Sequence, residues 1–134
     1  MKQEMNEKSR KDLIAYRLKR AEETLEEAKF TASGGFYNAA INRLYYSSYY
    51  AVLAALLKDS ISANSHAGVK AMFHLNYILS GKFPREIGKY YSVLMESRQS
   101  GDYEDFTYYD KDDFIRLLAM AEQLLVSIRN YVLS

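Results

Sequence analysis

The chain has 134 residues, which is enough for one domain with a hydrophobic core. It contains no cysteine, which excludes disulfides, zinc–thiolate sites and a cysteine nucleophile. The formal net charge of +1 argues against a broad binding surface for nucleic acid or anionic membrane. A single proline indicates long uninterrupted helices, and 13 tyrosines exceed what a small core can hide with every hydroxyl paired.

No segment has the length and apolarity of a signal peptide or a membrane span, so we expect a cytoplasmic protein without membrane contact. Residues 1–8 are polar and are expected to be frayed. The whole chain, 1–134, is expected to form a single helical domain.

Helical periodicity begins at Ser9, and Ser33-Gly34-Gly35 provides a stop. The next predicted helix, from about Phe36 to Lys58, is apolar nearly all round and should therefore be central. The remaining elements are a helix from His66 to about Ser80 capped by Ser65, a helix from Pro84 to about Arg98, a loop from Gln99 to Tyr109, and a last helix with a capping box of Asp110 and Asp113.

No strand pattern is present. The predicted fold class is all-α: an up-and-down antiparallel bundle of four long helices plus one shorter helix.

Arg43 is the only charge between Lys29 and Lys58, and it shares a helix face with Tyr46 and Tyr50. A lone arginine in an apolar helix must find a carboxylate, a carbonyl or an anionic ligand. Two interpretations follow: a phosphate site flanked by phenols, or a core arginine paired with an acidic residue such as Asp102.

Arg98, Asp102 and Tyr103 form a second candidate cluster. They could clasp the end of the bundle. Alternatively, Arg98 holds a phosphate while Asp102 orients Arg43 or a ribose hydroxyl.

His66, at the start of a helix, is expected to be neutral and is the one candidate for a catalytic base. It could equally be a partly buried residue that closes one end of the bundle. His66 and His74, the only two histidines, are poorly spaced for a metal site, so no metal and no cofactor are expected.

The segment Asn38 to Leu57, which contains Arg43-Leu44-Tyr45-Tyr46, resembles the second-helix signature of HEPN domains. His66 with Val69 and Phe73, and Arg98-x-x-x-Asp102-Tyr103, extend the resemblance to about residues 10–132. It implies a helical bundle, often a homodimer, that frequently occurs beside a small nucleotidyltransferase in toxin–antitoxin-like or substrate-binding pairs.

Many HEPN domains are metal-independent endoribonucleases with a histidine four to six residues after an arginine. This chain lacks that spacing. The leading hypothesis is therefore a nucleotide- or RNA-binding partner protein, whose groove at one end of the bundle is lined by Arg43, Tyr46, His66, Arg98, Asp102 and Tyr103. The alternatives are RNA cleavage with His66 in the histidine role, and a purely structural dimerisation or interaction module.

Overall fold

The computed structural model describes residues 6–134; the expectation for residues 1–5 lies outside this range. The described part is all-α, as predicted, with five helices and no strand. The helices are α1 (Glu7–Ser33), α2 (Tyr37–Lys58), α3 (His66–Phe73), α4 (Arg85–Tyr103) and α5 (Lys111–Leu133).

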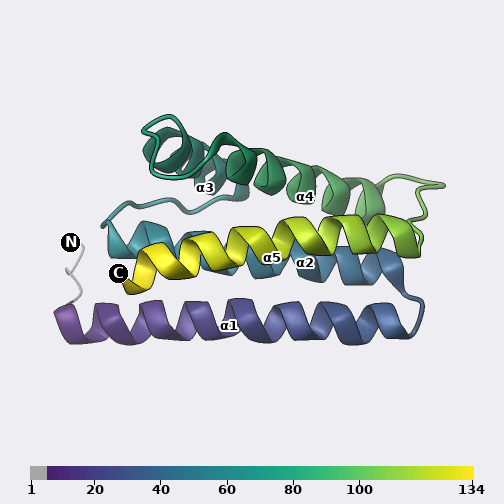
Figure 1. Ribbon diagram of the computed structural model, residues 1–134, viewed down its shortest axis with the longest axis horizontal. Helices are drawn as coiled ribbons and strands as arrows, with labels where there is room; N and C mark the ends of the chain where they lie inside the picture. The colour runs from purple at the N-terminus through teal and green to yellow at the C-terminus, as the bar shows by residue number, and fades with distance from the viewer. Residues whose placement is uncertain (1–5) are drawn as a thin grey trace.

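The four long helices run up and down, with α1, α2 and α5 side by side and α3 and α4 covering them (Figure 1). Helix α2 contacts each of the other four helices, which confirms its predicted central place. Its small residues permit this close approach, because Ala40, Ala51, Ala54 and Ala55 are completely buried. The core is thus organised around the helix whose sequence is apolar on nearly every face.

The helix ends follow local sequence signals. The Ser65 side chain accepts from the Gly68 amide at the start of α3, and Asp110 and Asp113 form the predicted capping box of α5. Gly35 has a φ of 83°, a left-handed conformation that ends the α1–α2 turn at little steric cost. Helix α1 begins at Glu7, two residues earlier than the periodicity suggested, because Asn6 caps it.

Two predicted boundaries were wrong. Helix α4 does not end near Arg98 but continues to Tyr103, so the loop shortens to residues 104–110. The predicted third helix is not continuous: His74–Ile78 form a π-helical turn directly after α3. In both places tertiary packing decides the backbone conformation.

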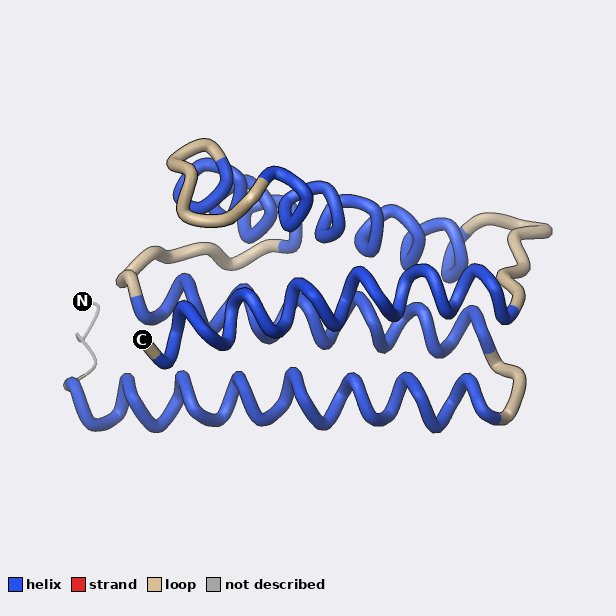
Figure 2. The backbone as a smooth tube through the Cα atoms, in the orientation of Figure 1, coloured by secondary structure: helices blue, strands red, loops and turns tan. Residues whose placement is uncertain are grey.

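The connection between α2 and α3 runs back along the bundle before α3 begins (Figure 2). His66, the first residue of α3, therefore lies beside the middle of α2 and not beyond its end. Within residues 6–134, no helix is both long and apolar enough to cross a membrane.

Candidate functional site

Arg98 is the most deeply buried cation of the described chain, at 7% exposure. Helix α4 places its guanidinium over three aromatic rings: Tyr45 at 5.1 Å, Tyr46 at 5.6 Å and Tyr103 at 5.7 Å. Within residues 6–134 its one carboxylate partner is Asp102, one helical turn further on, at 3.7 Å. The Arg98 Nε has no hydrogen-bond partner among the described residues. A charge held mainly by ring faces keeps more of its field than one neutralised by a close ion pair.

His66 shares two of these rings with Arg98. Its Nδ1 lies 2.6 Å from the Tyr45 hydroxyl, and its ring centroid lies 4.7 Å from that of Tyr49 and 5.8 Å from that of Tyr46. Burial lowers the pKa of His66, and the positive charge of Arg98 lowers it further. Both effects favour the neutral form of the imidazole.

A chain of polar contacts joins α1, α2 and α4 at the border of this cluster. Asn42 donates from Nδ2 to Asp102 at 2.9 Å, and its Oδ1 accepts from Arg43 at 2.9 and 3.1 Å. Arg43 also pairs with Glu27 at 3.6 Å and lies 5.1 Å over the Tyr46 ring. The proposed Arg43–Asp102 ion pair is thus absent from the described chain, because Asn42 stands between the two charges.

The structure brings all six residues chosen from the sequence into one neighbourhood: Arg43, Tyr46, His66, Arg98, Asp102 and Tyr103. Their roles are unequal, because Arg43 is partly exposed and pairs with Glu27, whereas Arg98 is buried against three rings in addition to its pairing with Asp102. The cluster runs along the flank of the bundle, from the middle of α2 beside His66 to the last turn of α4, where Asp102 meets Asn42 near the start of α2. Tyr50, expected to flank Arg43, instead lies under Arg20 at 5.4 Å.

Sequence reasoning missed three residues that build the cluster: Asn38, Asn42 and Tyr49. Asn38 fastens the α4–α5 loop, since its Nδ2 donates to the carbonyls of Gly101 and Thr107 and its Oδ1 accepts from the Tyr109 amide. A signal was present, because two asparagines four residues apart in an otherwise apolar helix must both satisfy their amides.

Among residues 6–134, no group of three or more histidine, aspartate or glutamate side chains is placed to hold a metal ion. The chemistry available at the cluster is that of a neutral imidazole, several phenols and a buried guanidinium.

These features define a class: a small all-α bundle with an arginine, a histidine and several tyrosines gathered beside its central helix. The chain belongs to the HEPN domain family, whose family model matches residues 14–131. It is similar to a UPF0332 protein of Thermotoga maritima, at 34% identity over 96% of each chain.

Two further similarities place the chain. A Methanocaldococcus jannaschii protein whose name describes it as a candidate toxin is 30% identical over 87% of this chain and 80% of its own length. The crystal structure of an archaeal HEPN homologue superimposes with a TM-score of 0.72 at 21% identity, covering 89% of this chain and 97% of that one. That structure supports the fold alone.

Proposed function

We propose that the protein is the toxin-type member of a toxin–antitoxin-like pair and that it binds RNA or nucleotide phosphates at the cluster around Arg98 and His66. The observation that carries this proposal is the shared environment of these two residues. Arg98 is buried against Tyr45 and Tyr46, and its charge is felt at His66. A phosphate beside His66 would meet that field, while bases stack on neighbouring phenols.

The exposed surface of the cluster fits this role. Tyr103 is 75% exposed at the end of α4, and Tyr46, Tyr49 and His66 are each partly exposed. A ligand can therefore reach the rings directly, while Arg98 acts from below them through its charge. The name of the Methanocaldococcus jannaschii relative supports the toxin half of the proposal.

The test is a fluorescence-anisotropy titration of a labelled single-stranded RNA of about ten nucleotides, with ATP as competitor. We expect Arg98→Met to weaken binding at least about ten-fold, because solvent screens a buried charge less than it screens an exposed ion pair. Arg129→Gln is the matched control, since Arg129 is an exposed arginine of α5 that pairs with Glu22. Equal affinity of the wild type and Arg98→Met would refute the site.

RNA cleavage without a metal is the second candidate function. The observation in its favour is the contact of 2.6 Å between the Tyr45 hydroxyl and Nδ1 of His66, which fixes the imidazole beside the rings that hold Arg98. A neutral, oriented histidine can accept a proton, and a nearby cation stabilises the charge that develops on a phosphate. Incubation with RNA in EDTA tests this: cleavage that persists undiminished in His66→Gln removes His66 from the mechanism.

Partner binding is proposed for the α4–α5 loop, where Phe106 is 92% and Tyr108 is 84% exposed. Aromatic side chains of this kind are typical of interface centres. The proposed partners are a second copy of the chain and a small nucleotidyltransferase. Light scattering with and without such a partner tests this by the mass of the particles in solution. A Phe106→Ser variant that forms assemblies of the same mass as the wild type would exclude the loop from the interface.

A further inference from the structure

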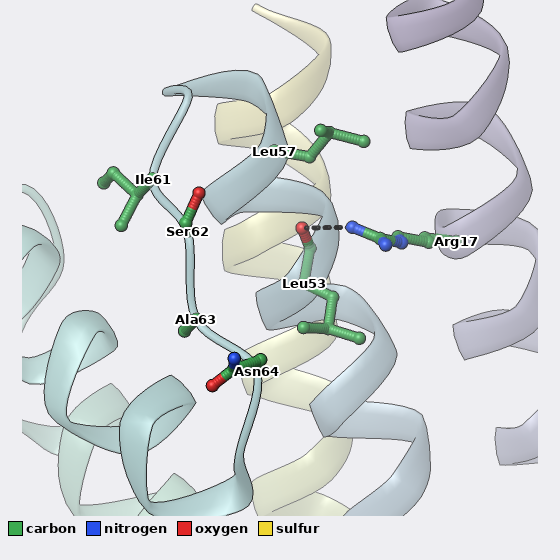
Figure 3. Close-up of a pocket in the computed structure, with 7 residues that line it drawn as sticks. All are labelled: Arg17, Leu53, Leu57, Ile61, Ser62, Ala63 and Asn64. Atoms are coloured by element: carbon green, nitrogen blue, oxygen red, sulfur yellow. Dashed lines mark hydrogen bonds between the residues drawn. The ribbon is translucent and has the colours of Figure 1, made fainter. Parts of the chain in front are cut away.

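A cavity of about 490 Å³ lies between α1, α2 and the loop that precedes α3, away from the rings that cover Arg98. Figure 3 shows Arg17 reaching into it from α1 toward the Leu53 carbonyl, opposite the loop. The volume falls within the range of small-molecule sites in proteins. The lining residues are Arg17, Leu53, Leu57, Ile61, Ser62, Ala63 and Asn64.

Arg17 differs from the neighbouring arginines of α1 because it has no carboxylate partner among the described residues. Arg10 pairs with Glu7 and Arg20 pairs with Glu23, but no ion pair involves Arg17 among residues 6–134. Its one hydrogen bond in this part of the chain goes to the Leu53 carbonyl at 3.4 Å, which is long for such a contact. Since a guanidinium has five N–H donors, most of its hydrogen-bonding capacity is unused.

The cost of this arrangement is visible in the electrostatics. Burial lowers the pKa of Arg17, and the nearby Tyr49 phenol only partly counteracts this effect. A half-buried cation without a counter-charge is destabilising unless an anion joins it. The other walls suit an organic ligand, because Leu53, Leu57 and Ile61 provide apolar surface and Ser62 and Asn64 provide polar groups.

We propose that this cavity binds a small organic anion, whose oxyanion group pairs with the Arg17 guanidinium and whose apolar body lies against Leu53, Leu57 and Ile61. The planar fork of arginine matches the oxygens of a phosphate or a carboxylate equally. The cavity shares no lining residue with the cluster around Arg98, although Tyr49 of that cluster lies near Arg17, so each site can fail without the other.

The experiment is an amide-detected NMR titration of the full chain with three probes: inorganic phosphate, adenosine monophosphate and hexanoate. We expect shifts confined to residues 53–64 and to the turn of α1 around Arg17, and stronger binding of one organic probe than of inorganic phosphate. Preference for adenosine monophosphate identifies a phosphate ligand, and preference for hexanoate identifies a carboxylate. Absence of shifts with all three probes at millimolar concentration overturns the proposal.

Two variants test the role of Arg17. Arg17→Gln should weaken binding at least about ten-fold, because it removes a charge-assisted contact. Leu57→Glu supplies the missing carboxylate inside the cavity and should abolish binding even if Arg17→Gln fails to fold. Arg43→Gln is the control, since Arg43 belongs to the other cluster, and should leave the shifts unchanged. Undiminished binding in Arg17→Gln or in Leu57→Glu would also overturn the proposal.

Discussion

Replacement of Arg98 by methionine distinguishes between two roles for this residue: phosphate binding and closure of the bundle. Methionine has a similar length and is apolar, so it can occupy the space among the Tyr45, Tyr46 and Tyr103 rings without a charge. If Arg98 is held for function, the substitution should leave stability nearly unchanged and weaken phosphate binding. If Arg98 is a clasp that closes the bundle, the substitution should destabilise the fold.

The contacts of Arg98 give the magnitude. Each of the three ring contacts, at 5.1–5.7 Å, is worth about 0.5–2 kcal/mol, and the ion pair with Asp102 at 3.7 Å adds about 1 kcal/mol at most. Against this stand a desolvation penalty of several kcal/mol for the guanidinium and about 1–3 kcal/mol for the unpaired Nε. These contributions nearly cancel. Methionine adds about 1.5–3 kcal/mol of apolar burial, so we expect a loss of at most about 1 kcal/mol, or a gain.

Urea unfolding followed by tyrosine fluorescence measures the free energy, and thermal melting provides a second readout. For a chain of this length, 1 kcal/mol corresponds to a change in melting temperature of about 3–4 °C. A loss of more than about 2 kcal/mol would refute the reasoning, because it would show that the ring contacts and the ion pair outweigh the desolvation.

Three further predictions concern the surroundings of the cluster. Burial and neighbouring cations lower the pKa values of His66 and His74 below the ordinary 6.5, so the unfolded chain binds protons at higher pH than the folded chain, and the free energy of unfolding should fall as pH drops through 6.5. His66→Gln should reduce the slope of the free energy of unfolding against pH, and an unchanged slope would contradict the burial of His66. Asn38→Ala removes three hydrogen bonds of 2.8–3.2 Å, which should lower the free energy of unfolding by about 2–4 kcal/mol and speed proteolysis within residues 104–110. Asn76→Ala is the control, because the Asn76 amide bonds only within its own turn, and it should lose less than about 1 kcal/mol. Equal losses in the two variants would contradict the role of Asn38 in fastening the α4–α5 loop. Tyr45→Phe should cost about 1–2 kcal/mol in the wild type but much less in a His66→Gln background, and additive losses would show that the hydroxyl–imidazole contact contributes nothing.

The sequence was sufficient for the fold class, because each helix carries its own apolar stripe and most carry their own caps. The end of α4 could not be read in this way. Gln99-Ser100-Gly101 resembles a stop signal, yet the helix continues because Asp102 accepts from Asn42 and forms an ion pair with Arg98. Gly101 is tolerated there because the Tyr109 ring lies where a Cβ would project, at 3.0 Å.

The π-helical turn after α3 has a similar origin. A Cβ on Gly88 of α4 would lie 2.9–3.2 Å from Ile78 and His74, so α4 packs tightly against this turn. The sequence around His74 contains no local signal for such a contact, because the partner lies on another helix. The six candidate site residues could be chosen from the sequence by their residue types and motifs. Which of them contact one another could not, because those contacts join different helices. Asn42 resembles an ordinary polar residue until α4 places Asp102 beside it.

The protonation of the two histidines tests the central claim most directly. Their imidazole proton resonances can be followed by NMR against pH, with and without a short single-stranded RNA. A phosphate bound at the cluster would offset the charge of Arg98, so the pKa of His66 should rise on binding while that of His74, which lies beside Lys70 and Ser92, stays fixed. An unchanged pKa of His66 at saturating RNA, or an equal rise for both histidines, would contradict a phosphate site at Arg98 and His66.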